Sequence, residues 1–429
     1  MNESVLKEII ENYKTPTYVF DINKLNNRIS YLKSKLSKRI KLCYAIKANS
    51  FIVNDIEDII DRLEVCSPGE YKICKEKSID KNIILISGVY KTPEVIEDMI
   101  LNDGITNFTI ESINQFNLLK NLSINKNINV LIRITSGNQF GINEEEAENI
   151  IKNRNLYKNL NILGIQYFSG TQKKSIKNLN KELDKIQTFI DFLGERYNFE
   201  TKQLEFGAGF PVQYFQNEDF DEETFLNEFS ELIDNIKFEG EIILELGRSI
   251  AANCGYYITK VVDTKTNKGQ NYAILDGGIH HLVYYGQSMA MKLPICDVYP
   301  KKEKNDEKWN LCGSLCTVND ILVKQFPTGN LKINDLLIFK NTGAYCMTEG
   351  ISLFLSRDLP TVLKINKNNA ENTTKVIITI FISETNIVSP AVAKAAKARL
   401  RKNIAGVKIS RIKNKTPIIH KSSHIIKPH

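Results

Sequence analysis

Lys47 ends an apolar, β-prone stretch, KLCYAIKANS, where a lysine is ordinarily unfavourable. At the two-residue period of a strand, Lys47 shares a face with the small residues Cys43 and Ala45. A lysine amine held in a partly dry setting loses some preference for its charge and can attack an aldehyde. The alternative is a lysine at the end of a strand that simply reaches solvent.

Glycines and small hydroxyl side chains follow two later apolar runs. GAGFP begins with Gly207, Ala208 and Gly209, while SGT begins with Ser169 and ends with Thr171. Backbone N–H groups of glycine-rich loops, together with helix N-termini, form cradles for phosphate. By itself this loop is weak evidence, because glycines also mark plain turns.

Glu245 and Arg248 stand three residues apart in ELGRS. A carboxylate in a partly buried pocket is costly without a cationic partner, so Arg248 could simply neutralise Glu245. Alternatively, Glu245 could face a protonated ring nitrogen. An amine nucleophile, a phosphate cradle and a carboxylate for a ring nitrogen are three requirements of pyridoxal 5′-phosphate (PLP), so we expect this cofactor.

The elements that must position these groups alternate between strands and helices. We interpret eight apolar runs between residues 41 and 248 as strands: KLCYAIK, RLEVCS, NIILIS, TNFTIES, NVLIRI, LGIQYFS, QLEFGAG and EIILELG. Segments with three- and four-residue apolar spacing, such as EETFLNEFSELIDNI, lie between most of them. This order predicts an α/β fold with a closed (β/α)8 barrel, whose active site would lie at the C-terminal ends of the strands; an open doubly wound sheet is the alternative.

After Gly247 the pattern changes to strands without intervening helices, such as GYYITKVVD and KVIITIFIS, which predicts an antiparallel β domain. We expect four parts in order. Residues 1–22 add a strand, TPTYVFD, to the β domain; residues 23–249 form the barrel; residues 250–388 form the β domain; and residues 389–429 form a basic tail.

Composition limits the compartment and the chemistry. MNESVLKEIIENYK lacks the features of a signal peptide, and no apolar run approaches the roughly 20 residues that cross a bilayer, so we expect a cytoplasmic protein without a membrane partner. The 8 cysteines show no disulfide or zinc framework and the 5 histidines are scattered, so we expect no metal. The basic tail is expected to be solvated, to steer an acidic partner such as a carrier protein, or to bind nucleic acid without specificity.

Six motifs resemble those of one family over roughly residues 15–365. They are similar to motifs of the fold-type III PLP-dependent decarboxylases, which act on diaminopimelate, ornithine and arginine. YAIKAN resembles the cofactor-lysine motif, EVCSPGE a second-strand motif, and GAGFP and ELGR the glycine loop and ring-nitrogen carboxylate. CGSLCTVND resembles a segment that crosses the dimer interface, and GAY a segment whose tyrosine reaches the cofactor. The resemblance implies a homodimer with an alanine-racemase-like barrel and β domain.

The resemblance also implies roles for individual residues. Lys47 would bind the cofactor covalently, and either Lys47 or Cys316 of the partner subunit would return a proton to the substrate. The residues implied to contact the cofactor are Lys47, Glu70, Phe168, Ser169, Thr171, Gly207, Ala208, Gly209, Glu245, Arg248 and Tyr345. Those implied to contact the substrate are Thr317, Asp320, His280 and His281.

Three departures from the family pattern indicate a divergent subgroup. Phe168 stands where the family usually has a histidine; a phenyl ring can stack on the cofactor but cannot titrate. Thr317 stands where diamino-acid decarboxylases typically have an acidic residue for a distal ammonium. ILDGGIHHLVYYGQSMAMKLP lacks the usual arginine and resembles the butirosin-pathway-like subgroup, which acts on a carrier-linked glutamyl group. We therefore expect an α-decarboxylase that releases CO2 and an amine from an unusual or carrier-linked amino acid.

Two other functions remain open. An amino-acid racemase shares the fold, but its motif continues with Tyr-Gly-His-Gly where Ser50, Phe51 and Ile52 stand here. A non-catalytic regulator of the same family would tend to lose the cofactor lysine or the cysteine, and both are present.

The two adjacent histidines also have an alternative to substrate binding. His280 and His281 could be one packed and one solvated side chain.

Overall fold

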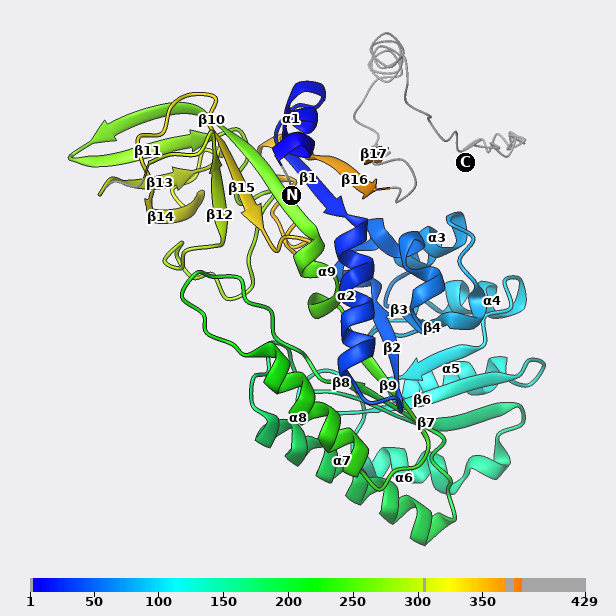
Figure 1. The fold of residues 1–429 in the computed structure, drawn as a ribbon. Coiled ribbons are helices and arrows are strands. Elements are labelled where there is room, and N and C mark those ends of the chain that lie inside the picture. The colour runs from blue at the N-terminus through cyan, green and yellow to red at the C-terminus, as the bar shows by residue number, and fades with distance from the viewer. Residues whose placement is uncertain (1–2, 304–305, 368–373, 380–429) are drawn as a thin grey trace, which may run out of the picture. The chain divides into compact units, whose positions relative to one another are not determined.

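The computed structural model describes residues 3–303, 306–367 and 374–379 (Figure 1). The expected basic tail, residues 389–429, and the end of the expected β domain, residues 380–388, lie outside the described residues. Within the described part, no helix is both long enough and apolar enough to cross a membrane.

Eight parallel strands form a closed barrel in sequence order, β2 to β9, and β9 pairs with β2 to close it. The strands are β2 Ile40–Ala45, β3 Arg62–Val65, β4 Ile84–Ile86, β5 Asn107–Ile110, β6 Ile128–Ile134, β7 Leu160–Phe168, β8 Gln203–Gly207 and β9 Glu241–Leu246. The predicted barrel is confirmed. The alternative, an open sheet, is excluded because β2 and β9, which would be its edge strands, pair with each other.

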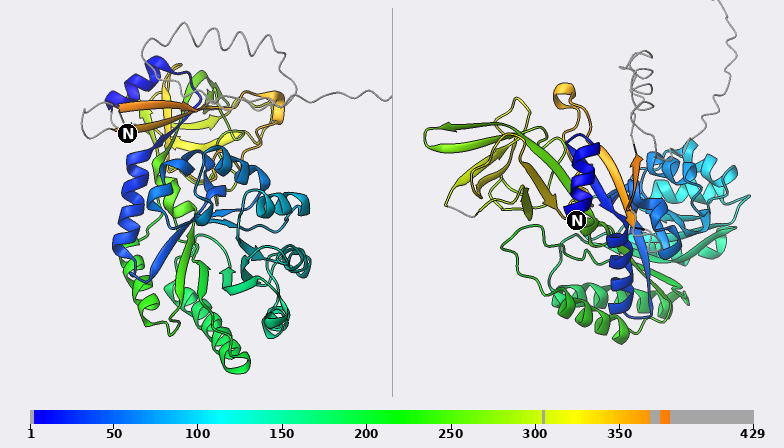
Figure 2. Two further views of the ribbon diagram at one scale, coloured as in Figure 1. Left: turned by 90° about the vertical axis from the view of Figure 1, so that its right-hand side faces the viewer. Right: turned by 45° about the horizontal axis from the view of Figure 1, so that its top comes forward.

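Helices alternate with the barrel strands and cover them (Figures 1 and 2). They are α2 Ile22–Lys35, α3 Pro68–Glu76, α4 Pro93–Leu101, α5 Ile113–Leu122, α6 Glu144–Lys152, α7 Ile176–Tyr197, α8 Glu222–Asn235 and the short α9 Arg248–Ala251. Ser67, Ser112 and Ser175 each accept a hydrogen bond from the first turn of α3, α5 and α7, which explains where these helices begin. Shorter 3-10 turns are η1 Ile46–Ala48, η2 Ser50–Asp55, η3 Glu57–Ile59, η4 Lys81–Ile83, η5 Arg154–Leu156, η6 Ala252–Cys254 and η7 Phe354–Ser356.

The second sheet has nine strands in the described part of the chain. They are β1 Thr17–Asp21, β10 Gly255–Asn267, β11 Gln270–Leu275, β12 Cys296–Tyr299, β13 Lys308–Cys312, β14 Ile321–Pro327, β15 Leu336–Lys340, β16 Thr361–Lys367 and β17 Thr374–Thr379. Most neighbours are antiparallel, as expected, but β1 with β16 and β11 with β13 are parallel pairs. The N-terminal helix α1 Glu3–Asn12 precedes β1, which lies between β10 and β16.

The β domain meets the barrel at the loop that carries Lys47. The backbone N–H of Tyr345 donates to the carbonyl of Ala48 at 2.8 Å, and the side chain of Asn49 donates to the carbonyl of Gly343 at 2.9 Å. A Cβ at Gly343 would lie 2.0 Å from the carbonyl oxygen of Ala251, so only glycine fits at this position beside the backbone of Ala251. The two parts of the fold are therefore joined at the rim where an active site is expected.

Candidate active site

A cavity of about 240 Å³ opens at the C-terminal ends of the barrel strands. Seven of the predicted site residues line it: Lys47, Phe168, Thr171, Gly209, Glu245, Arg248 and Tyr345. Residues from four barrel loops and from the β domain thus share one cavity. A larger cavity of about 440 Å³ lies in the β domain and is lined mainly by apolar residues, none of them among the predicted site residues.

Lys47 lies in η1, two residues after β2 ends. Its Nζ is 2.5 Å from Glu64 Oε2, 3.3 Å from Glu245 Oε1 and 3.7 Å from the sulfur of Cys66. Burial lowers the pKa of Lys47, but together the nearby carboxylates of Glu64 and Glu245 raise it by more than burial lowers it. The pKa of Lys47 therefore lies well above its usual value. This reverses the expectation that Lys47 has a weakened preference for its charge, because two carboxylates flank the amine.

Glu64 was missed in the sequence, although a carboxylate inside the apolar run RLEVCS is as unusual as Lys47 in its own run. Burial raises the pKa of Glu64, and the contact with Lys47 lowers it more, so that Glu64 carries the negative charge. Burial, and then the charge of Glu64, raise the pKa of Glu245. Two carboxylates therefore share one ammonium, and Glu245 is the one that retains a proton more readily.

Arg248 does not neutralise Glu245: the ion pair that the described residues give Glu245 is with Lys47. Arg248 instead donates to the hydroxyl of Tyr214 at 2.8 Å. Its guanidinium lies over the rings of Tyr285 and Tyr345, at 4.7 and 4.6 Å from their centroids. Arg248 is buried, and its Nε has no partner among the described residues. The site thus contains a buried cation with a free donor.

Tyr345 reaches this cation from a backbone conformation that is rare for tyrosine, with φ of +64°. Gly247 allows the contact, because a Cβ at that position would lie 2.9 Å from the Tyr345 hydroxyl. Such strained residues often occur at functional sites, where the surrounding structure holds them. Tyr285 and Glu349 also line the cavity and were missed. Tyr285 stands in ILDGGIHHLVYYGQSMAMKLP, where only the two histidines were considered, and Glu349 belongs to none of the motifs.

The glycine loop shapes the cavity in two ways. Gly209 has φ of +60°, and a Cβ there would lie 2.2 Å from the carbonyl of Gly170. Gly207 pairs with Phe168 across β7 and β8, and a Cβ there would lie 2.2 Å from the phenyl ring. Gly209 faces the cavity with Thr171, whereas Gly207 and Ala208 pack behind it.

Ser169 and Glu70 do not line the cavity. The Ser169 hydroxyl donates to Glu182 at 2.7 Å and accepts from Lys173. Glu70 accepts from the backbone N–H of Cys66 at 2.6 Å near the start of α3. Both side chains thus have partners that organise the loops next to the cavity.

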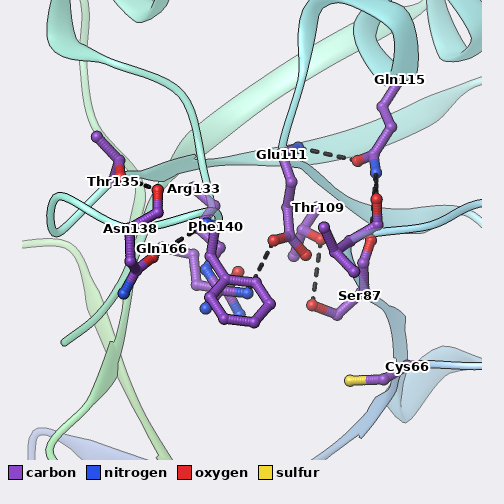
Figure 3. Close-up of polar contacts among 12 residues, drawn as sticks. Cys66, Ser87, Thr109, Glu111, Gln115, Arg133, Thr135, Asn138, Phe140 and Gln166 are labelled. Atoms are coloured by element: carbon purple, nitrogen blue, oxygen red, sulfur yellow. Dashed lines mark hydrogen bonds and ion pairs between the residues drawn. The ribbon is translucent and has the colours of Figure 1, made fainter. Parts of the chain in front are cut away.

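Figure 3 shows side chains on or just after the barrel strands β3 to β7, among them Arg133 and Glu111. Arg133 forms an ion pair with Glu111 at 2.9 Å, and its guanidinium lies 4.9 Å from the ring centroid of Phe140 and 6.0 Å from that of Phe168. Phe168 is therefore packed between Gly207 and a paired arginine, which fixes the ring at the cavity wall. Arg133 was missed, although an arginine within the apolar run NVLIRI could have identified it.

The four residues implied to bind substrate, and Cys316, lie in the β domain and do not line the cavity of their own chain. Cys316 is exposed and Thr317 is half-buried. Asp320 is buried and accepts from the backbone N–H groups of Ile279 at 2.8 Å and Leu315 at 2.7 Å, so it holds two loops together.

His280 and His281 are both buried, which differs from the expectation of one packed and one solvated ring. His281 lies between the hydroxyl of Tyr257 at 3.2 Å and the carbonyl of Asp358 at 2.9 Å. Burial lowers the pKa of His281 to about 4. The structure of a single chain therefore gives this pair a packing role.

The cavity fits PLP on the evidence of its own residues. An amine, a carboxyl group, a phenyl ring and a buried arginine whose Nε has no partner among the described residues all line the same cavity. These four groups are the contacts expected for an aldehyde, a ring nitrogen, a phosphate and a planar ring. No group of three or more metal-ligating side chains occurs in the described residues.

Residues 22–252 match the family model described as pyridoxal-dependent decarboxylase, pyridoxal binding domain. The chain belongs to the pyridoxal-dependent decarboxylases. This confirms the predicted family, cofactor and enzyme class, because the match covers the barrel that holds Lys47 and Glu245.

The chain is also similar, over most of its length, to other decarboxylases and to a solved structure. It is 26% identical over 406 residues to the L-glutamyl-(BtrI acyl-carrier protein) decarboxylase of Niallia circulans, covering 86% of this chain and 92% of the relative. It is 24% identical over 412 residues to the 2-[(L-alanin-3-ylcarbamoyl)methyl]-2-hydroxybutanedioate decarboxylase of Staphylococcus aureus, covering 86% and 99%. The diaminopimelate decarboxylase of Helicobacter pylori, solved with L-lysine, has a TM-score of 0.76 at 21% identity, covering 87% of this chain and 95% of that one, which confirms the fold.

Proposed function

We propose that this pyridoxal-dependent decarboxylase removes the α-carboxylate of an unusual or carrier-linked amino acid, in a biosynthetic role, and releases CO2 and an amine. One relative acts on a glutamyl group of an acyl-carrier protein, which supports a tethered substrate. Thr317 also supports the proposal, because its hydroxyl cannot neutralise a distal ammonium as a carboxylate does. The observation that carries the chemistry is that Lys47 and Glu245 lie 3.3 Å apart in the cavity that Arg248 lines.

The cavity residues divide the binding of the cofactor among them. Lys47 would hold the aldehyde carbon covalently, Glu245 the ring nitrogen, and Arg248 with Gly209 and Thr171 the phosphate. When bound, PLP accepts the electron pair that remains as CO2 leaves. Phe168 would cover the ring by stacking, without a proton to donate.

A proton must then reach the substrate carbon. Lys47 is well placed to supply it, because the neighbouring carboxylates favour its protonated form. The second donor would be Cys316 of the partner subunit. Its exposure, and the 89% exposure of its neighbour Val318, support a homodimer in which this loop enters the cavity of the other subunit.

A cytoplasmic location stays a prediction of the same proposal. All eight cysteines are free, including the half-buried Cys66 and the exposed Cys316, as expected in a reducing compartment.

The proposal is tested by measuring CO2 release across a panel of amino acids, free and loaded on acyl-carrier protein. We expect release from one class in the presence of PLP, and we expect Lys47→Ala to abolish both the cofactor absorbance and CO2 release. Interconversion of enantiomers without CO2 would instead show a racemase. Retention of full activity by Lys47→Ala would contradict the assignment of the amine.

A further inference from the structure

Gln166 of β7 lies between two buried carboxylates inside the barrel. Its Nε2 is 3.0 Å from Glu205 Oε1 and 3.4 Å from Glu245 Oε2. Gln166 is 1% exposed and Glu205 is fully buried. One amide group therefore links Glu245 to a second carboxylate that the sequence analysis did not consider.

The orientation of this amide has a clear electrostatic cause. Turned over, Gln166 would direct its carbonyl oxygen at two carboxylate oxygens, whereas the observed orientation directs N–H donors at them. The cost is that Gln166 Oε1 has no hydrogen-bond partner among the described residues. The barrel leaves one buried acceptor unpartnered in order to hold donors against Glu205 and Glu245.

Glu205 is itself held from the other side. Its Oε2 accepts from Arg62 Nη1 at 2.9 Å, and Arg62 Nη2 donates to Gln203 Oε1 at 3.2 Å. Gln203 in turn donates to Glu241 at 2.8 Å. A continuous series of side chains thus runs from Glu245 through the barrel, and each member restricts the next.

This series constrains one oxygen of Glu245 and leaves the other for the cavity. Oε2 accepts from Gln166, while Oε1 has Lys47 as its partner at 3.3 Å. Once Lys47 is bonded to the cofactor, Oε1 is the oxygen that remains to meet a cationic ring nitrogen. Without the amide, Glu205 and Glu245 would lose the donor that they share, and Oε2 of Glu245 would lose the contact that orients it.

We propose that Gln166, held by Glu205 and Arg62, is a positioning residue that orients the Glu245 carboxylate toward the ring nitrogen of PLP. This inference rests on the proposed role of Glu245. It goes beyond that role by assigning three residues, on β7, β8 and β3, to the control of one contact with the cofactor.

The test compares PLP with its 1-deaza analogue, in which a carbon replaces the ring nitrogen. Each ligand is titrated into cofactor-free protein, and the dissociation constant is read from the absorbance of the bound form. We expect wild type to prefer PLP. Gln166→Met, which has similar length and no hydrogen-bonding amide, should lose about tenfold in affinity for PLP and little for the analogue.

Two further variants make the result interpretable. Gln166→Asn is too short to reach both carboxylates and should behave like Gln166→Met, so the test still stands if the methionine variant does not fold. Gln203→Met removes an amide four contacts away from Glu245 and should keep the wild-type preference for PLP to within about twofold.

The outcomes separate the inference from the proposed function. Equal losses of affinity for PLP and for the analogue in the Gln166 variants would show a merely structural role and overturn the inference. An unchanged preference in those variants would overturn it too. A wild-type protein that binds both ligands equally well would instead contradict the proposed contact between Glu245 and the ring nitrogen.

Discussion

Glu64 Oε2 lies 2.5 Å from Lys47 Nζ, closer than the carboxylate of Glu245 on the same amine. The register of the barrel produces this contact. Ala45 pairs with Glu64 across β2 and β3, and Lys47 follows Ala45 by two residues, in η1. The closest counter-ion of Lys47 is therefore a residue outside the predicted site.

Glu64→Gln should lower the pKa of Lys47, because it removes the nearer of the two carboxylates that raise it. The amine would then lose its proton at lower pH and react faster with PLP near neutrality. Stopped-flow absorbance at a series of pH values measures this as a shift of the rate profile to lower pH. Glu70→Gln is the control, since Glu70 accepts from the backbone of Cys66 and should leave the profile unchanged.

Glu245→Gln should stabilise the cofactor-free protein more at pH 8 than at pH 5. The pKa of Glu245 is raised by burial and by Glu64, so its contribution to stability is complete below the usual value of 4.5 and is lost as the pH rises toward about 8. A neutral amide removes that loss. Urea unfolding at both pH values should show a difference on the order of 1 kcal/mol or more, and an equal effect at both would contradict the raised pKa.

We expect Glu64 to have the opposite effect on the pH dependence of stability, and at low pH. Its pKa is lowered to about 2 by the contact with Lys47. The stability contributed by the pair is thus complete above the usual value of 4.5 and is lost as the pH falls toward about 2. Glu64→Gln should therefore flatten the acid limb of the curve of unfolding free energy against pH, whereas the exposed Glu94 should have no such effect when replaced by Gln.

Gly209→Ala should destabilise the protein more than Gly269→Ala. Both glycines have positive φ, +60° and +76°, but a Cβ at Gly209 would lie 2.2 Å from the carbonyl of Gly170, while nothing lies within 4 Å of one at Gly269. The control therefore reports the cost of the backbone conformation alone, about 1 kcal/mol. We expect the excess at Gly209 to reach about 1–3 kcal/mol in urea unfolding, with weaker binding of PLP.

If Cys316 is the required proton donor and each cavity takes it from the other subunit, Lys47→Ala and Cys316→Ala proteins should each be inactive and should restore activity when mixed. A mixed dimer then has one cavity with both residues intact. Equal amounts should reach about a quarter of wild-type activity after subunit exchange. Each variant incubated alone is the control. No recovery, with exchange shown by differently tagged subunits, would place Lys47 and Cys316 in the same site of one chain.

Local patterns in the sequence were sufficient for the barrel, the cofactor and the motifs around Lys47 and Glu245. Each strand carries its own apolar period, and each motif is contiguous, so neither depends on a distant residue. Glu64, Gln166, Glu205 and Arg133 stand in those same strands, but their partners lie on other strands or in the segments that follow them. Their roles became apparent only when barrel closure set the register between neighbours.

In the β domain, residues that the motifs assigned to the substrate do not line the cavity of their own chain. His280, His281 and Asp320 belong to motifs that resembled substrate contacts, yet the tertiary structure buries them and pairs His281 and Asp320 with groups of their own chain. A sequence motif determines which groups a loop carries. Only packing decides whether those groups face a cavity or a neighbouring backbone, because most buried polar groups pair with whatever group the fold places beside them.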